Sequence, residues 1–464
     1  MRIKFTYSIT LLLLLMAIVP YRMEAGNDRT SARLVGLARA NTAVARGIDA
    51  VGVNPALLSL PHTSKFEVSV LPAGVLLGSN FMDYSMYNTY FTGVNDPVTG
   101  ERVAKHLSPQ DKQDILDSFP GNHGTIQGDA QILWFGVSFR APRFGGIALT
   151  VSDRVAMNLT LPGDYLKMLL EGFSEFGSTY DFSGTDAQSW WTRQFAIAYA
   201  SPRLRLVEFL PWISFGGGIK YLQGYAYFGT EAYDGYISNL DYENGFLLRG
   251  EMNMVTRRAS ANFIYDPDMY EFNPVGQPAG TGWGVDLGIA AGISNNIVAG
   301  ISITDIGSIR WKENTYGSSA DLVVEVDDIV SSAQQDSLLD AYTGKDEAIG
   351  SFSTALPSAI RTGVTVQFSP ELLVAADYTQ GLNKMPANST TPRFAIGVEW
   401  RPVNFLPVRT GMAAGGFNGF TWALGFGFNF SFFDLEIATE NIGLLLYQNK
   451  SKHASVTVGT KFRF

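Results

Sequence analysis

The stretch GFTWALGFGFNF, residues 419–430, decides the class of fold. From Phe420 to Phe430 every second residue is large and apolar, and the residues between them are small or uncharged polar. Alternation with a period of two is typical of a β-strand, because its successive side chains point to opposite faces of a sheet. A soluble sheet would carry charge on its wet face, and neither face does here. The bulky row therefore fits contact with lipid, and the small row fits a crowded interior.

The same alternation recurs along the chain, up to the last segment ASVTVGTKFRF (454–464). Further examples are ILWFGVSF (132–139), QFAIAYA (194–200), WISFGGGIKYL (212–222), WGVDLGIA (283–290), NIVAGISITD (296–305), AIRTGVTVQF (359–368) and RFAIGVEW (393–400). A tilted strand crosses a bilayer in about 9–11 residues, which is the length of the Phe420–Phe430 row. Links at 141–146, 369–371 and 415–419 are typical of tight hairpin turns.

Strands can cross lipid only when every backbone group is bonded, which requires a closed barrel. The pattern predicts an all-β fold, a transmembrane antiparallel β-barrel of about 14 strands with a small N-terminal helical plug. Polar residues on the inner row, among them Arg361, Glu399 and Lys461, are expected to pair with one another or to meet water. Trp134, Trp212, Trp283 and Trp400 are interpreted as a girdle at the membrane interfaces. The alternative, a large soluble β-sandwich or β-propeller, lacks a reason for the lipid-like row.

Composition supports this class. Of 464 residues, only 17% are charged while 13% are aromatic and 48 are glycine, which suits a chain that meets lipid through alternate residues. The absence of cysteine excludes disulfides, thiolate metal sites and a lipid-anchored cysteine. A formal net charge of −9 disfavours nucleic acid as a partner.

The N-terminal residues predict that the protein is exported, and the chain is expected to have three parts. Residues 1–25 have a positive start and an apolar stretch from Leu11 to Val19, too short to span a bilayer as a helix, and are interpreted as a signal peptide. Residues 26–62 are expected to form the plug and residues 63–464 the barrel.

Three stretches interrupt the strand pattern and are expected to be long loops on one side of the barrel: 160–192, 229–282 and 313–357. The first has apolar residues at helical spacing, from Leu161 to Phe173, and the third contains VDDIVSSAQQDSLLDAY, so each predicts a short amphipathic helix.

The expected plug carries the motif NPALL. Asn54 can cap the following turn by accepting a hydrogen bond from a free backbone N–H, and Pro55 suits the first helical position because its missing N–H has no helical partner. The preceding stretch from Leu34 is rich in alanine and glycine, which lets it pack closely inside another structure.

This placement resembles the FadL/PorV-type outer-membrane barrels, the superfamily of the long-chain fatty-acid channels. The resemblance rests on Gly36, Leu37, Arg39, Ala40, Ala43 and Ala45, then on Asn54, Pro55, Ala56 and Leu57, with Phe66–Leu71 as the expected first strand. The segment 111–122 is similar to an uncharacterised branch of the superfamily. Alternate apolar residues ending at Phe462 and Phe464 resemble the signal that the barrel-assembly machinery recognises.

The resemblance implies location in the bacterial outer membrane, with lipid around the barrel and an apolar small molecule as the ligand. That ligand would be captured beside the plug and released sideways through a gap in the wall, for which Gly216–Gly218, Gly425 and Gly427 are candidate positions. A channel of this kind should have a lumenal pocket lined by Leu, Phe and Met. The alternative is a PorV-like scaffold for secretion or assembly that binds other proteins through its loops. Neither ligand-binding residues nor protein partners are assigned.

Catalytic chemistry has little support in the sequence. The four histidines, His62, His106, His123 and His453, have no HExxH or paired spacing, and no GxSxG motif is present. The acidic segment 233–244 lacks the spacing of a calcium loop. We therefore expect no enzyme activity, no catalytic residue, no metal site and no cofactor.

Overall fold

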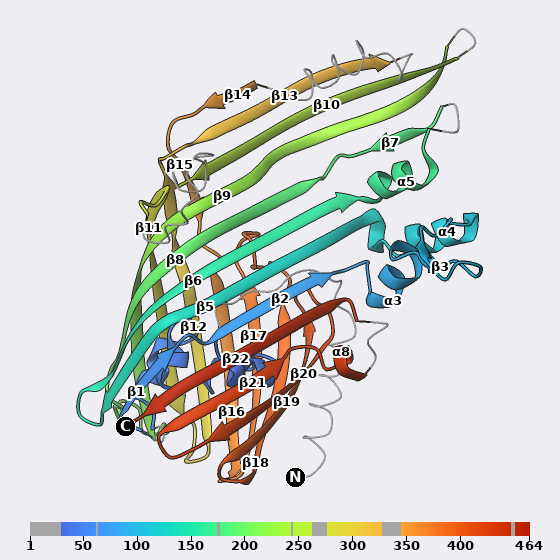
Figure 1. The fold of residues 1–464 in the computed structure, drawn as a ribbon. Coiled ribbons are helices and arrows are strands. Elements are labelled where there is room, and N and C mark those ends of the chain that lie inside the picture. Colours follow the sequence, from blue (N-terminus) through green and yellow to red (C-terminus); the bar gives the residue numbers. More distant parts are fainter. Residues whose placement is uncertain are drawn as a thin grey trace.

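The computed structural model describes residues 29–61, 64–173, 177–242, 245–261, 276–326, 345–446 and 451–464. Figure 1 shows a tall tilted barrel whose N-terminal helices lie inside its lower half. The expected signal peptide, residues 1–25, and His62 lie outside the described residues.

The wall is a closed antiparallel barrel of 14 strand positions, as the sequence predicts. Its last strand pairs with its first, Phe462 opposite Val68 and Thr457 opposite Gly74. In order around the barrel the wall consists of β1 (Phe66–Val70) continued by β2 (Ala73–Ser79), β5 (His123–Ala141), β6 (Gly145–Pro162), β8 (Asp186–Ala200), β9 (Trp212–Tyr242), β11 (Gly280–Gly292), β12 (Ile297–Trp311), β16 (Ala359–Ser369), β17 (Leu372–Gly381), β18 (Arg393–Val403), β19 (Leu406–Gly415), β20 (Thr421–Asn429), β21 (Phe433–Thr439) and β22 (His453–Arg463).

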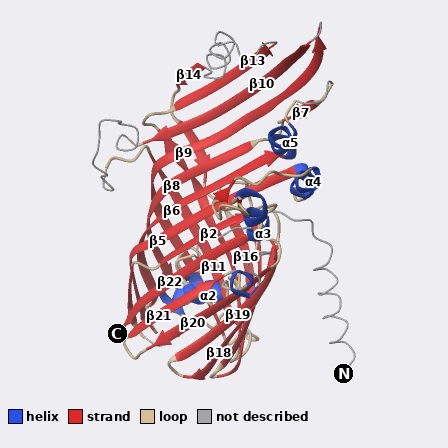
Figure 2. Ribbon diagram, turned by 45° about the vertical axis from the view of Figure 1, so that its right-hand side comes forward, coloured by secondary structure: helices blue, strands red, loops and turns tan. Residues whose placement is uncertain are grey.

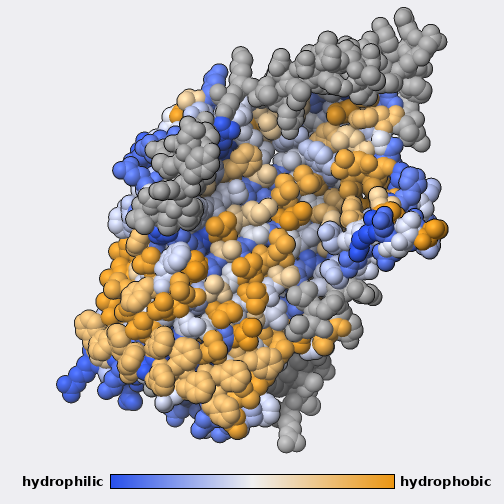
Figure 3. Space-filling model, in the orientation of Figure 1, coloured by the Kyte–Doolittle hydropathy of each residue, from blue (hydrophilic) through white to orange (hydrophobic). Residues whose placement is uncertain are grey.

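The two rows of β20 face the two media that the sequence predicts. Trp422, Phe426 and Phe428 are exposed on the outside, whereas Thr421 and Ala423 are buried inside. Figure 3 shows apolar side chains gathered over the lower half of the outer surface. Burial of such a side chain away from water contributes about 1.5–3 kcal/mol, so this surface is stable against lipid and unfavourable in water.

The tryptophans divide into two groups. Trp134, Trp283 and Trp400 face outward and are exposed, as expected of an interface girdle. Trp212 does not belong to the girdle, because it packs against the apolar core of the plug.

Part of the predicted long loops is sheet instead. The far half of β9 continues past the barrel and pairs with β10 (Gly245–Ser260), which pairs with β13 (Tyr316–Val326), and β13 pairs with β14 (Lys345–Ala348). We call β10, β13, β14 and the far half of β9 the extension (Figures 1 and 2). The sequence pattern did not predict it, because residues 225–260 lack the continuous apolar alternation of the membrane-spanning strands. Short strands β7 (Thr179–Asp181) and β15 (Phe352–Ala355) pair with β9 and β12.

The helices that follow the N-terminal segment lie at the same end as the long connections. They include α3 (Tyr84–Met86), η3 (Tyr87–Phe91), α4 (Pro109–Asp117), η4 (Pro120–Asn122), α5 (Gly163–Glu171) and α8 (Gly443–Leu446), beside a small hairpin of β3 (Val94–Asn95) and β4 (Arg102–Val103). Helix α5 confirms the helix expected in 160–192, whereas most of the second expected helix lies outside the described residues.

In the described ranges, none of the helices has the length and apolar character needed to cross a membrane.

The three predicted turns are confirmed. Residues 141–146 connect β5 to β6, 369–371 connect β16 to β17, and 415–419 lie between β19 and β20.

Candidate lumenal site

The plug consists of three short helical segments, α2 (Ala32–Gly36), η1 (Gly47–Ala50) and η2 (Pro55–Ser59). Ser31 caps α2 by accepting a hydrogen bond from the Leu34 N–H. Asn54 caps η2 by accepting from the Ala56 N–H at 3.2 Å, with Pro55 at the start of the helix, as the motif predicts.

Asn54 also has a role that the motif does not predict. Its side-chain amide donates to the Thr42 carbonyl at 3.0 Å within the plug and to the Ile289 carbonyl of β11 at 3.2 Å. The cap therefore fixes the plug to the wall as well as starting a helix.

Glycines of the inner row form the surface on which the plug backbone lies. A Cβ added at Gly216 would lie 2.1 Å from the Ala56 nitrogen, and one at Gly425 would lie 3.0 Å from the Gly36 Cα. Such distances are too short for any side chain. The wall glycines with plug atoms this close include Gly74, Gly146, Gly216, Gly288, Gly300, Gly397, Gly411 and Gly425.

Ion pairs bind one side of the plug to β18, β19 and β21. Arg33 contacts Glu399 at 2.8 Å, Arg409 contacts the same carboxylate at 2.7 Å, and Arg409 also contacts Glu436 at 2.7 Å. All four side chains are largely or fully buried. Charges in such a position are stable only when paired, because burial removes them from water.

A second network holds the N-terminal end of the plug. Arg29 contacts Asp129 at 2.5 Å and Glu440 at 3.2 Å, and Arg154 contacts Asp129 at 3.0 Å. Arg39 of the predicted motif lies 3.7 Å from the same Glu440 carboxylate and is buried.

Further inner-row charges have partners on the plug or within the wall. Lys461 pairs with Asp49 of the plug, and Arg361 donates to the Asn41 side chain at 3.4 Å. Lys220 contacts Asp286 at 2.9 Å and Asp305 at 2.6 Å within the wall. The expectation that inner charges pair is confirmed for Glu399 and Lys461.

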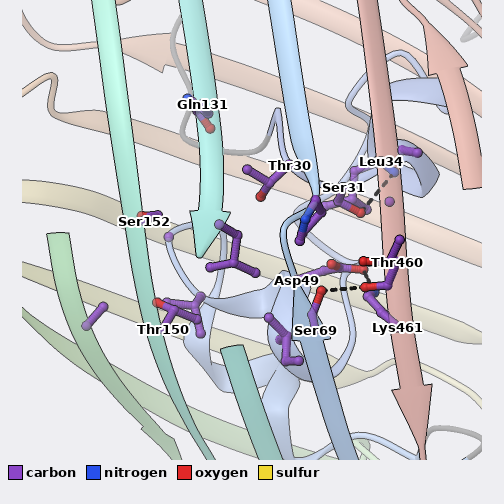
Figure 4. Close-up of a pocket in the computed structure, with 18 of the residues that line it drawn as sticks. Thr30, Ser31, Leu34, Asp49, Ser69, Gln131, Thr150, Ser152, Thr460 and Lys461 are labelled. Carbon is purple, nitrogen blue, oxygen red and sulfur yellow. Dashed lines mark hydrogen bonds and ion pairs between the residues drawn. The ribbon is translucent and has the colours of Figure 1, made fainter. Parts of the chain in front are cut away.

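A cavity of about 60 Å³ remains between the plug and the wall. Its lining combines a few apolar side chains, such as Leu34 and Leu133, with many polar and charged ones, among them Asp49, Arg154, Asp434, Glu436 and Lys461. Figure 4 shows Asp49, Ser69, Thr460 and Lys461 together at one side of this cavity. The expected lumenal pocket lined by Leu, Phe and Met is therefore not found at this cavity, whose lining is largely polar.

The cavity adjoins a break in the wall where the first strand meets the last. The pairing of β22 with β1 ends at Val68 and resumes with β2 at Ala73. Leu71 has a positive φ of 58° and Pro72 has no N–H, so this stretch cannot continue the ladder. We call residues 69–72 and 459–461 the seam.

Side chains replace the missing ladder bonds of the seam. The Ser69 hydroxyl donates to the Thr460 carbonyl, and the Thr460 hydroxyl donates to the Val70 carbonyl, both at 2.5 Å. Ser69, Pro72, Gly459 and Thr460 also line the cavity. The expected first strand, Phe66–Leu71, thus ends one residue early and continues as β2 after the break.

The glycines proposed as positions for a gap are closed. Gly216–Gly218 pair with both β8 and β11, and Gly425 and Gly427 lie in the continuous ladder between β20 and β21. The close approach of the plug backbone accounts for the glycine at position 216.

The C-terminal residues lie at the end of the barrel with the short turns. The Phe464 ring is 6.0 Å from that of Phe66, and the Phe462 ring is 5.0 Å from that of Phe433. Their recognition by the barrel-assembly machinery stays a prediction.

In the part of the chain that the structure describes, no cluster of three or more His, Asp or Glu side chains has metal-binding geometry. His106 is exposed, whereas His453 is buried as the first residue of β22.

Sequence reasoning missed Arg29, Arg33, Asp129 and Arg154 as anchors of the plug. A signal was available, because Asp129 and Arg154 are charged residues at inward positions of lipid-spanning strands. Their partners on the plug were not identifiable, since they lie 100 or more residues away along the chain.

These features define a class, an antiparallel outer-membrane-type β-barrel of 14 strands whose lumen holds an N-terminal plug. Within this class, the chain belongs to the family of unknown function DUF5723, whose model matches residues 61–440. A comparison with curated proteins gives no match.

Solved structures similar to this chain include two toluene transporters and a FadL homologue. The toluene transporter TbuX of Ralstonia pickettii has 13% identity and a TM-score of 0.44, over 92% of this chain and 98% of its own. A FadL homologue of Pseudomonas aeruginosa has 12% identity and a TM-score of 0.44, over 95% and 98%. The toluene transporter TodX of Pseudomonas putida has 11% identity and a TM-score of 0.43, over 95% and 98%. Values this low do not transfer a function to this chain.

Proposed function

We propose that the protein is an outer-membrane uptake channel for small apolar molecules, in which the plug controls passage and the seam is the exit. The observation that carries the proposal is the position of the cavity, which lies between the plug and the wall and is lined by the seam itself. A molecule that reaches the cavity is separated from the outside of the barrel by two side-chain hydrogen bonds rather than by a continuous ladder.

The interior above the cavity supports an apolar substrate. Trp190, Leu222, Ile309, Trp311 and Leu356 form a buried apolar cluster there, contributed by strands β8, β9 and β12 and by the segment before β16. An apolar molecule gains about 25 cal/mol per Å² when such surfaces exclude water around it.

The structure corresponds to a closed state of this channel. A cavity of about 60 Å³ is well below the roughly 150 Å³ in which benzene binds inside a protein. The plug must therefore move before even a small aromatic molecule can occupy the site, and the ion pairs of Arg33 and Arg29 set the cost of that movement.

A cross-link at the seam tests the proposal. The chain has no cysteine, so the pair Val70→Cys/Thr460→Cys, two neighbouring positions on the outward row, can be oxidised to join β1 to β22 without competition from other thiols. In Gram-negative cells that produce this variant, uptake of the apolar dye N-phenylnaphthylamine is expected to fall to the level of cells without the protein, and a reducing agent is expected to restore it.

The matched control is Leu435→Cys/Thr460→Cys, which joins the same residue of β22 to its other neighbour, where the ladder is continuous. Uptake that is unchanged by the seam cross-link, or equally reduced by the control cross-link, would refute exit at the seam.

A second candidate function, a scaffold that binds other proteins, is favoured by the extension. A sheet that projects beyond the wall is not needed to close the barrel (Figure 1). Stable co-purification of a partner that is lost when the extension is removed, together with no dye uptake by the intact protein, would favour the scaffold.

A further inference from the structure

A group of cationic side chains lies at the end of the barrel with the short turns. It consists of Lys65 before β1, Arg140 and Arg143 at the turn between β5 and β6, and Arg203 and Arg205 in the connection between β8 and β9. We call these five residues the basic rim. Within 139–145 and 201–211 the rim is accompanied by one carboxylate, Glu208, although the chain as a whole is acidic.

The basic rim is one continuous surface over neighbouring strand ends. The Arg140 N–H donates to the Lys65 carbonyl at 2.9 Å, which places β1 and the first turn together. The Tyr199 hydroxyl donates to the Phe144 carbonyl at 2.9 Å, and their rings are 5.6 Å apart, which joins that turn to the end of β8.

Large apolar side chains are interleaved with the cations. Phe209 is 79% exposed, Leu206 is 61% exposed and Phe144 is 54% exposed. A further row of outward apolar residues, Phe195, Ile197 and Tyr199, leads from this surface up the lipid-facing side of β8. The apolar residues of the rim therefore continue the surface that the membrane covers.

The rim also has unused hydrogen-bonding capacity. Arg140 Nε and Ser64 Oγ are shielded from solvent and have no hydrogen-bond partner within the described ranges. Both residues line a small pocket at the strand ends together with Lys65, Ser138 and the Glu67 carboxylate, which accepts from the Ser138 hydroxyl at 3.0 Å. The positive charge that is available to an external anion is therefore mainly that of Arg143, Arg203 and Arg205, which are exposed beyond the pocket.

We infer that the basic rim binds anionic phospholipids of the membrane leaflet at the short-turn end, with Phe209 and Leu206 inserted among the acyl chains. Arginines beside an anionic lipid surface attract its phosphates, and exposed aromatic and aliphatic residues next to them favour the boundary between headgroups and hydrocarbon. This site is separate from the lumen and does not depend on what the channel transports.

The depth of the β8–β9 connection is the first test. A nitroxide label at Phe209→Cys, the single cysteine of the reconstituted protein, is expected to be accessible to oxygen and shielded from a water-soluble nickel complex. Leu169→Cys on α5, which is 76% exposed at the opposite end, is the control and is expected to be accessible to nickel. A label at 209 that is as accessible to nickel as the label at 169 would overturn the inference, as would its shielding by a co-purified protein.

Lipid selectivity is the second test. Native mass spectrometry of the protein from bilayers of phosphatidylglycerol and phosphatidylethanolamine is expected to show preferential retention of phosphatidylglycerol. The variant Arg143→Gln/Arg203→Gln/Arg205→Gln is expected to lower the ratio of retained phosphatidylglycerol to retained phosphatidylethanolamine by about a hundredfold, because each charge contributes roughly fivefold. The matched control Arg102→Gln/Lys112→Gln/Lys167→Gln removes three charges at the long-loop end and is expected to have no effect.

No preference in the wild-type protein, or an equal loss in the control, would refute lipid selection by the rim. Because the depth test and the lipid retention of the wild-type protein both use the basic rim with its charges in place, together they decide the proposal even where the triple variant fails to fold.

Discussion

Glycine has two distinct roles in the wall strands, and neighbouring residues of β9 illustrate both. Gly216 faces the plug, where its lack of a side chain lets the backbone of η2 lie directly against the wall. Gly217 faces the other way and has no atom closer than 3.9 Å to an added Cβ. The sequence has glycine at both positions, and only the direction in which an added Cβ would point distinguishes them.

Gly216→Ala is therefore expected to destabilise the folded barrel by about 1–3 kcal/mol, the usual cost of overpacking, because its Cβ would lie 2.1 Å from the Ala56 nitrogen. The measurement is urea unfolding followed by the mobility shift of folded barrels in detergent gels. Gly217→Ala is the control, and a loss of stability equal to that of Gly216→Ala would show that the plug contact is not the cause.

Arg409 is the central cation of the buried network beside the plug, since it contacts both Glu436 and Glu399, and Glu399 is the partner of Arg33 on the plug. Arg409→Met is expected to cost about 3–5 kcal/mol in the free energy of unfolding, because it leaves buried carboxylates without their main partner.

Arg249→Met, which breaks an exposed pair with Glu251, provides the comparison and is expected to cost less than about 1 kcal/mol. Similar losses in the two variants would contradict the view that the buried network holds the plug.

Helices outside the membrane follow local rules that a sequence displays directly. Helix α4 begins with a capping box in which the Ser108 side chain accepts from the Asp111 N–H and the Asp111 carboxylate accepts from the Ser108 N–H. The hydrogen bond from the Ser108 backbone keeps the pKa of Asp111 below its ordinary value. The extension displays no such local signal, because its strands pair residues far apart in the chain, such as Arg258 of β10 and Tyr316 of β13.

The lowered pKa of Asp111 predicts the pH dependence of α4. The cap contributes fully above the ordinary carboxyl pKa and is lost as the pH falls through the lowered value. Hydrogen exchange of residues 109–117, corrected for intrinsic rates, is expected to become faster in acid. In the Asp111→Asn variant, the protection of the helix against exchange should be the same in acid as at neutral pH. If the helix of this variant loses as much protection in acid as that of the wild-type protein, the cap is not the cause.

The barrel as a whole closes without the extension. The lower part of β9 pairs directly with β11, Gly224 opposite Gly280, so the wall is continuous below the point where the far half of β9 leaves it. Closure therefore depends on the membrane-spanning ladders and not on the strands above them.

Replacement of residues 225–279 by a short turn is accordingly expected to leave a folded, heat-modifiable barrel with a retained plug. Limited proteolysis of the N-terminal segment and circular dichroism are the measurements. A barrel that no longer folds would show that the extension contributes to closure. As a control, a segment as long as the one removed is inserted at 415–419, which tests whether the barrel tolerates a change of chain length at its long-loop end.

The sequence by itself determined the medium on each side of the strands, the closed barrel, the approximate strand number, the turns and the Asn54 cap. These follow from residue type and short-range spacing, because side-chain alternation and helix capping are local. Only the tertiary structure decided which glycines contact the plug, which charges pair across the lumen, that the cavity is polar, and that β1 and β22 meet at a broken ladder. Those contacts join residues as far apart as Arg33 and Glu399, or Ser69 and Thr460, and chain spacing does not encode them.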